Sequence, residues 1–415
     1  MLLTMIGKDE LLEVARRIWK IPLYVLALPA VMVVRLIRPL LLVRFGFLYG
    51  NRIGHFAANT ELYLCERDAG INVPQQRYVD LFYMVPPVCN QQLAKMWKRI
   101  MHIWPIWILA PIIRINRLIP GSDVHEIANL PTNDRDVHNL LSKFPAHLQF
   151  TSDEEAIGEN LLRSMGISPG TPFVCLIVRD SAYLKAHMPE VADWCEHDYR
   201  DSNIQNYVLA AEALTDRGYV VIRMGAKVNE PINSSNSRVI DYATNGMRSD
   251  FADIYLGAKC EFCISVSTGF DAVPEIFRRT IVFVNMVPLG YLRISLAKSI
   301  GITKHHFAVQ KNRELTLSET FTHGVGFSLR TSDYESKGIQ LIENTPEEIR
   351  DVVVEMADRL RGTWQPGPDD DALQRRFWEI YPADAHDAYQ DRPLHGEIRC
   401  RFGSQFLRAN GEFLK

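Results

Sequence analysis

Short apolar segments that alternate with helical segments constrain the fold of this 415-residue chain more than any other feature of its sequence. Residues 172–178 (PFVCLIV) form a continuous apolar run, which is typical of a strand buried on both faces of a parallel sheet. A helix is predicted over residues 204–217, and a second strand over residues 219–224 follows it. Strands that alternate with helices in this way predict parallel βαβ units and an α/β fold.

The first half of the chain shows the same alternation. Residues 41–49 (LLVRFGFLY) predict a buried strand, the loop GNRIGH follows it, and residues 77–84 predict a second strand after an intervening helix. Two such sets in tandem predict two Rossmann-like domains that face each other across a cleft. We expect the first domain over residues 1–155, the second over residues 156–365 and a C-terminal tail over residues 366–415.

The composition excludes several classes of protein. The formal net charge of −3 argues against a general nucleic-acid binder, which needs a basic excess. The seven cysteines are an odd number in a large chain, so we expect a reducing, cytoplasmic compartment rather than a disulfide framework. Cys260 and Cys263 form a CxxC, but no second pair follows at zinc-finger spacing, so we expect them in a buried strand.

Two apolar runs in the first half have basic neighbours. Residues 21–34 (IPLYVLALPAVMVV) contain no charge but are shorter than the roughly twenty residues that a membrane-spanning helix needs. Residues 101–113 form the second run, with Trp97, Trp104 and Trp107 suited to a water–lipid boundary. Two interpretations stay open: peripheral contact with the inner face of the plasma membrane, or burial of both runs in a large core. The basic neighbours are Arg35, Arg38, Arg44, Lys95, Lys98, Arg99, Arg114 and Arg117.

Candidate ligand-binding residues occur where predicted strands end and helices begin, the edge at which open α/β sheets bind their ligands. Arginines, small hydroxyls, glycines and acidic residues occupy these positions: Arg179, Asp180, Ser181, Arg200, Arg223, Gly225, Asp250, Ser267, Thr268, Gly269 and Glu275. Arginine forks and helix-start amides bind phosphate, so these positions predict a phosphate-binding rim. The alternatives are a structural pair of Arg179 with Asp180 or Glu275, and a plain turn over residues 267–269. The chain has neither a Walker loop nor a GxGxxG motif.

His55 is the candidate general base in the first half. It lies in the glycine-containing loop after the first predicted strand, and an imidazole titrates near neutral pH, so it can accept a proton from an attacking hydroxyl. The alternative is a histidine at a helix start that bonds to the backbone. Glu61, two turns further on, could act as the base instead or could orient His55.

Four segments resemble a family of inferred bacterial glycosyltransferases seen with surface-polysaccharide assembly: RIGHFAANTELYL, VRDSAYL, YRDSNIQNYVLAAEALTDRGYVVIRMGA and SDFADIYLGAKCEFCISVSTGFDAVPEIF. More distantly, the second half is similar to the fucosyltransferase-like GT-B superfamily, in which an arginine at a strand end binds the donor diphosphate. This likeness implies Arg179 at the diphosphate, and Asp250 and residues 267–269 near the nucleotide. The run VRDSAY has one arginine, where that superfamily has a histidine and paired arginines, so no fucosyl donor is implied.

The resemblance implies a GT-B glycosyltransferase that moves a sugar from a nucleotide-diphosphate donor, bound by the second domain, to a glycan or lipid-linked acceptor at the first. We expect no metal and no cofactor, with arginines and a helix dipole neutralising the leaving diphosphate, because no DxD follows a strand. Residues 369–371 (DDD) are expected in a solvated linker. Two alternatives stay open: a non-catalytic nucleotide-sugar-binding or membrane-associated scaffold protein, and a GT-B-type nucleotide-sugar epimerase.

Overall fold

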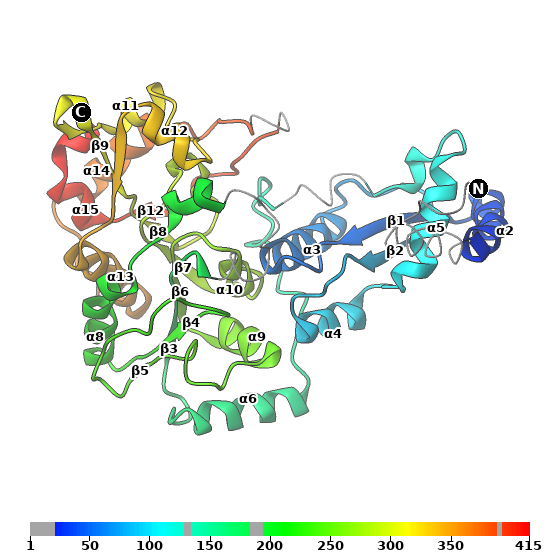
Figure 1. Cartoon of the computed structure of the whole chain (residues 1–415), viewed down its shortest axis with the longest axis horizontal. Coiled ribbons are helices and arrows are strands. Elements are labelled where there is room, and N and C mark those ends of the chain that lie inside the picture. The colour runs from blue at the N-terminus through cyan, green and yellow to red at the C-terminus, as the bar shows by residue number, and fades with distance from the viewer. Residues whose placement is uncertain (1–20, 128–133, 183–193, 388–391) are drawn as a thin grey trace, which may run out of the picture. The chain divides into compact units, whose positions relative to one another are not determined.

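The computed structural model describes residues 21–127, 134–182, 194–387 and 392–415 (Figure 1). Two compact units make up the chain: unit 1 extends to Asn133, and unit 2 begins at Asp134. Both units are α/β with parallel strand pairs at their centre, as the alternation of strands and helices predicts.

Unit 2 is built on a seven-stranded parallel sheet. In chain order its strands are β3 (Phe173–Ile177), β4 (Val220–Met224), β5 (Val239–Ile240), β6 (Phe262–Ser265), β7 (Thr280–Phe283), β8 (Ile300–Gly301) and β12 (Arg401–Phe402). Across the sheet they lie in the order β12-β8-β7-β6-β3-β4-β5, and every neighbouring pair is parallel. The first six strands therefore have the 3-2-1-4-5-6 order of a doubly wound Rossmann sheet, with β12 added at one edge.

Helices connect and cover these strands. They are α6 (Ser152–Ser164), α8 (Val208–Asp216), α9 (Asp250–Lys259), α10 (Ala272–Ile276), α11 (Leu317–Thr322), α12 (Thr331–Ser336), α13 (Pro346–Arg361), α14 (Asp370–Ile380) and α15 (Ser404–Ala409). The helix predicted over residues 204–217 begins as the 3₁₀ helix η3 (Ile204–Tyr207) and continues as α8. Cys263 is fully buried in β6, as expected, whereas Cys260 is fully buried at the end of α9 and not in the strand. Burial raises the pKa of the Cys263 thiol, which suppresses thiolate chemistry.

A small antiparallel sheet of β9 (His305–Ala308), β10 (Arg313–Glu314) and β11 (Ile339–Ile342) belongs to unit 2 as well. His305 lies between two carboxylates there. Its Nδ1 is 3.0 Å from Glu314 Oε2, and its Nε2 is 3.0 Å from Glu348 Oε2 of α13. This histidine therefore ties the small sheet to α13.

Unit 1 contains one parallel βαβ unit, formed by β1 (Leu42–Leu48), α3 (Ile53–Asp68) and β2 (Tyr78–Met84). Helices α2 (Ile21–Ile37), α4 (Gln91–Ile100) and α5 (Ile106–Arg117) complete it. Isolated parallel bridges, from Phe45 to Glu126 and from Phe82 to Ile103, extend the pairing on each side. Unit 1 is thus Rossmann-like with a smaller sheet than unit 2.

Two residues that the sequence suggested for a membrane surface lie in the core of unit 1. Trp97 is fully buried, and its Nε1 donates to the carbonyl of Phe56 at 3.1 Å, so its prediction at a lipid boundary is wrong. Arg44 is buried as well and makes two 2.7 Å hydrogen bonds to the carboxylate of Asp80. Tyr63 of α3 donates to the same carboxylate, so this ion pair joins β1, β2 and α3.

The boundary between the units lies earlier in the chain than the expected position at residues 155/156. Phe150 shows the reason, because its ring stacks on Phe277 and contacts the edges of other aromatic rings of unit 2. Helix α6 packs on α9 so closely that a Cβ on Gly158 would lie 2.0 Å from the ring of Tyr255. The polar segment after Asp134 is therefore part of unit 2.

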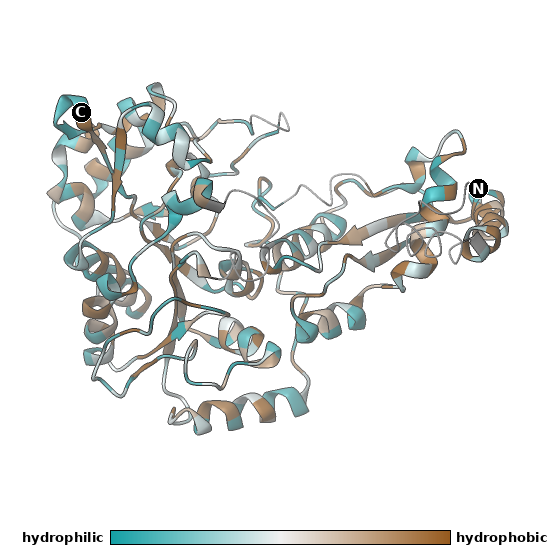
Figure 2. Cartoon of the chain, viewed as in Figure 1, coloured by the Kyte–Doolittle hydropathy of each residue, from teal (hydrophilic) through white to brown (hydrophobic). Residues whose placement is uncertain are grey.

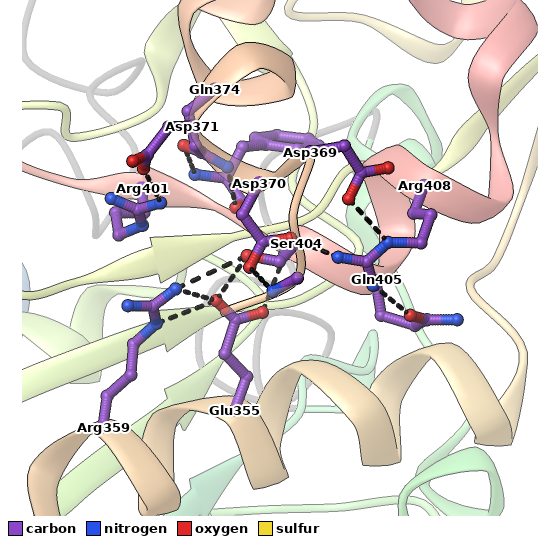
Figure 3. Close-up of polar contacts among 12 residues, drawn as sticks. Glu355, Arg359, Asp369, Asp370, Asp371, Gln374, Arg401, Ser404, Gln405 and Arg408 are labelled. Atoms are coloured by element: carbon purple, nitrogen blue, oxygen red, sulfur yellow. Dashed lines mark hydrogen bonds and ion pairs between the residues drawn. The ribbon is translucent and has the colours of Figure 1, made fainter. Parts of the chain in front are cut away.

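Residues 366–415 are integrated into unit 2 as well (Figure 3). The carboxylate of Glu355 in α13 accepts hydrogen bonds from the backbone N and the Oγ of Ser404 at 2.8 and 2.9 Å. Asp370 is buried in the first turn of α14, and its carboxylate pairs with Arg408. The expectation of a solvated linker over residues 369–371 is therefore wrong for Asp370, which has a structural partner.

Candidate functional site

The carboxyl edge of the unit 2 sheet has a point where the strand order reverses. Strands β3 and β6 are neighbours and parallel, while the chain continues from β3 outward to β4 and from β6 outward to β7. The loops that follow β3 and β6 therefore leave the sheet at the same edge and diverge. Doubly wound sheets bind their ligands in the crevice at such a switch point.

Arg179 follows β3 and is held by its own chain. Its Nη1 donates to Asp201 Oδ1 at 2.6 Å and to the carbonyl of His197 at 2.5 Å, and only 10% of the side chain is exposed. A structural pair of Arg179 was one alternative, but its partner is neither Asp180 nor Glu275. The pair fixes the segment around the 3₁₀ helix η2 (Trp194–Arg200) beside the end of β3.

Arg200 and Lys304 add two more cations next to this pair. Arg200 precedes Asp201 directly in the chain, and after burial its like charge is the largest cause that lowers the pKa of Arg179. Lys304 follows β8 and donates to the carbonyl of Asp201 at 2.6 Å. The Arg200 guanidinium lies 5.5 Å from the Tyr199 ring and forms no ion pair with any residue that the structure describes. We call Arg179, Arg200, Asp201 and Lys304 the Arg179 cluster.

Asp201 makes the charge of this cluster depend on pH. Burial raises the pKa of its carboxyl to about 6, because desolvation disfavours the charged form, and Arg179 opposes the rise only in part. Repulsion from Asp198 and Asp180 adds to the rise. The cluster therefore becomes more positive as the pH falls through about 6, which favours an anionic ligand.

The loop after β6 is wound around the side chain of Ser265. The Ser265 Oγ donates to Asp271 Oδ2 at 3.0 Å and accepts from the backbone N of Ser267 at 3.1 Å and of Thr268 at 3.4 Å. Ser267 has φ +61°, a left-handed conformation that reverses the chain within the loop. The backbone amides of Ser267 and Thr268 therefore already donate hydrogen bonds within the loop. The buried Thr268 Oγ1, by contrast, has no hydrogen-bond partner among the described residues. Gly269 opens the short 3₁₀ helix that follows.

Several other predicted site residues have structural partners instead. Asp180 joins two loops, because its carboxylate accepts from the backbone N of Ala182 and of Asn229 at 2.9 Å each, and Ser181 lies in the same turn. The remaining four lie outside the Arg179 cluster. Arg223 is buried, and its Nη1 lies 3.2 Å from Asp241 Oδ1, while Glu275 forms an ion pair with Arg293. Asp250 lies in the first turn of α9. Gly225 is packed so tightly that a Cβ at this position would lie 2.7 Å from the side chain of Val228.

The two residues predicted for proton transfer lie on α3 in unit 1. His55 is in the first turn of this helix rather than in a loop, is half-buried, and has its Nδ1 3.2 Å from Asn59 Oδ1. With a proton on Nδ1, the Nε2 lone pair is the basic site. Glu61 is fully buried and accepts from the thiol of Cys65 at 3.9 Å, so it points into the core of unit 1. His55 is thus the more accessible of the two.

The sequence missed Lys304 altogether. It follows β8, which has two residues and is too short for hydrophobicity to mark it, and the one available signal was a lysine directly after the short, mostly apolar segment IGIT. Asp201 as the partner of Arg179 was missed for another reason, because the two residues are 22 positions apart and meet through the fold.

No protein-family model matches the chain, and no curated protein matches it. Among solved structures, it is similar to a glycosyl transferase family 9 protein from Veillonella parvula, with 10% identity and a TM-score of 0.35 over 59% of this chain and 80% of that one. It is also similar to ADP-heptose LPS heptosyltransferase II of E. coli, with 15% identity and a TM-score of 0.42 over 77% and 98% of the two chains. A third similar structure is a candidate UDP-N-acetylglucosamine 2-epimerase from Listeria monocytogenes, with 9% identity and a TM-score of 0.25 over 78% of this chain and 98% of that one.

Two of these three proteins are glycosyltransferases, and none is a fucosyltransferase. Identities of 15% or less and TM-scores below 0.5 are too low to carry a conclusion about activity. The doubly wound strand order is established by the pairing of this chain's own strands.

Proposed function

We propose that this chain is a GT-B-type glycosyltransferase, which transfers a sugar from a nucleotide-diphosphate donor to a glycan or lipid-linked acceptor. The observation that carries the proposal is the Arg179 cluster at the switch point of a doubly wound sheet, where Arg200 has no anionic partner among the described residues. The sequence resemblance to bacterial glycosyltransferases supports the same class of reaction.

On the donor side, the diphosphate is the group that the cluster suits best. A guanidinium fork matches the oxygens of a phosphate, and Arg200 is the cation available for it. Arg179 has the supporting role of holding η2 in place through Asp201 and the carbonyl of His197. The Thr268 hydroxyl, from the neighbouring loop, offers one further donor.

On the acceptor side, His55 is the proposed general base. The acceptor oxygen attacks the anomeric carbon of the donor sugar, its proton passes to His55 Nε2, and the bond from the anomeric carbon to the diphosphate oxygen breaks. The nucleoside diphosphate leaves with the electron pair, and its charge is stabilised by Arg200 and the other cations of the cluster. The proposed reaction needs no other reactant.

The first test is a thermal-shift screen of the full chain against nucleotide-diphosphate sugars that differ in base and sugar. A donor that binds the folded state raises the melting temperature by mass action. The best binder is then incubated with candidate acceptors, and release of nucleoside diphosphate is measured. Arg200→Lys should weaken binding, while Arg163→Lys, an exposed arginine on α6, serves as the matched control.

The outcomes separate the alternatives. Stabilisation by none of the donors would contradict the proposal. Binding without transfer to any acceptor, unchanged in His55→Ala, would favour a nucleotide-sugar-binding protein. Conversion of the donor into an epimer in the absence of acceptor would favour an epimerase.

A further inference from the structure

Helices α2 and α5 of unit 1 expose an apolar surface to solvent. We call it the apolar face and define it by Leu26, Leu36 and Leu40 on and after α2, and Trp104, Trp107 and Leu118 before, on and after α5. Their exposed fractions lie between 47% and 81%. Helix α2 is predominantly brown in Figure 2, the colour of hydrophobic residues.

The apolar face is the outer side of a well-packed helix pair. Ala27 and Val31 of α2 and Leu109 of α5 are buried, and the two helices are neighbours. At 3.6 residues per turn, Leu26 and Leu36 lie on the side of α2 opposite Val31. A helix that is apolar on both sides needs a second apolar surface, because one side alone satisfies the core of its own unit.

Polar contacts hold this helix pair in place. The Arg35 guanidinium donates to Asn116 Oδ1 at 2.8 Å and to the carbonyl of Pro120 at 2.9 Å, both in or after α5. Arg114 of α5 donates to the Tyr24 hydroxyl of α2 at 2.6 Å. The apolar face is therefore presented by a fixed pair of helices.

The charge around the apolar face is basic. Residues 21–127 contain eleven Lys and Arg and six Asp and Glu, a formal net charge of +5 in a chain whose total is −3. Residues 21–60 and 81–122, which include α2, α4 and α5, contain no acidic residue. Arg38 is exposed between Leu36 and Leu40, and Arg114 is on the same face of α5 as Trp107, seven residues away.

We propose that the apolar face docks on the surface of an anionic lipid bilayer, with α2 and α5 lying in the plane of the interface. Tryptophans suit the headgroup level, and exposed arginines and lysines suit lipid phosphates. No helix in the described part of the chain is long and apolar enough to cross a membrane. The inference is independent of the proposed sugar transfer, since it concerns surface residues of unit 1 and needs no donor.

A second copy of the chain fits this surface less well than lipid. A symmetric dimer through the apolar face would bring Arg38 and Arg114 of one copy toward the same cations of the other, with no acidic residue from α2, α4 or α5 to compensate. An anionic bilayer supplies both the apolar interior and the negative charge.

The test is co-sedimentation of the full chain with phosphatidylcholine vesicles, with and without about one quarter phosphatidylglycerol, from ~0.05 to ~0.5 M salt. We expect binding to the anionic vesicles that weakens as salt rises. Trp104→Ser/Trp107→Ser should lower the partition coefficient about tenfold or more, from lost apolar burial, and Arg38→Gln should lower it about fivefold, from the loss of one charge. Ile157→Ser/Val309→Ser, at comparably exposed positions of unit 2, is the matched control.

Three results would overturn the proposal. The first is wild-type protein that stays in the supernatant with anionic vesicles at low salt. The second is a loss of binding in the control variant as large as in the tryptophan variant, with unchanged melting curves. The third is evidence for another occupant of the apolar face. A dimer in sedimentation velocity that is lost in the tryptophan variant would identify a second copy of the chain, and vesicle binding only after deletion of residues 1–20 would identify that segment.

Discussion

Replacing Arg200 with lysine distinguishes the roles of the two arginines at the carboxyl edge of the unit 2 sheet. A charge-assisted hydrogen bond contributes about 1.5–3 kcal/mol, and 1.4 kcal/mol is about a factor of ten in Kd, so loss of the guanidinium fork should weaken donor binding roughly 10- to 100-fold. The stability of the fold should change by less than about 1 kcal/mol, because the described side-chain contact that is lost is with the Tyr199 ring at 5.5 Å.

Arg179→Lys should have the opposite profile. Its guanidinium bonds both the Asp201 carboxylate and the carbonyl of His197, and lysine cannot reproduce that geometry. Breaking a buried ion pair costs about 3–5 kcal/mol. The Asp201 side chain is 26% exposed and lysine keeps the charge, so we expect a loss of about 1–2 kcal/mol in the free energy of unfolding.

Two measurements on the same proteins check this pair of expectations. Isothermal titration with the donor that binds best gives Kd, and urea unfolding gives the free energy of unfolding. Arg163→Lys should change neither quantity, because its ion pair with Glu159 is exposed. An unchanged Kd in Arg200→Lys, combined with a weakened Kd and unchanged stability in Arg179→Lys, would refute the assignment and return the diphosphate to Arg179.

Other side chains give predictions that are tested separately. His55→Ala should lower turnover by about 10²- to 10⁴-fold with the donor Kd retained, and near-normal turnover in His55→Gln would leave that residue a positioning role only. Burial lowers the pKa of His305, but hydrogen bonds to its two flanking glutamates raise it to about 9. Its stabilising contribution should therefore be full below about pH 6.5 and be lost as the pH rises through 9, and His305→Gln should remove this slope from unfolding free energies. Arg408→Ala should cost about 2–3 kcal/mol in urea unfolding, because it leaves the buried Asp370 carboxylate without its cation, whereas Arg375→Ala, at an exposed position of α14, should cost less than about 0.5 kcal/mol.

The central strands of unit 2 could be predicted from the sequence, but the outer ones could not. Strands β3, β4, β6 and β7 are runs of four or five residues, mostly apolar and separated by helices, so their hydrophobicity marks them. Strands β5, β8 and β12 have two residues each, too few for any periodicity. Their place depends on pairing across the fold, as when Arg401 pairs with Ile300.

The candidate site could be predicted in position but not in detail. An arginine directly after an apolar strand indicates a buried partner or a ligand, and Arg179 has the buried partner. No local pattern could single out Asp201, since the contact depends on how η2 folds back to β3. The burial of Glu61 could not be predicted, for a related reason. All ten residues from Phe56 to Cys65 are buried, so every side of α3 is covered over this stretch and even its polar residues are not exposed.

Strand β12 protects one flank of the unit 2 sheet. Strands with unpaired backbone groups at a sheet edge are templates for pairing with other chains, and proteins limit this hazard by covering such edges or keeping them short. Here β12, from residues 401–402, pairs with β8 and so covers its edge. The hydrogen bond of Ser404 to Glu355 and the ion pair of Arg408 with Asp370 hold the segment around β12 in place. A chain cut after Gly362 loses β12 together with α14, α15 and the stacked rings of Phe377 and Phe402, so aggregation through the uncovered edge of the sheet is the expected consequence of proteolysis there.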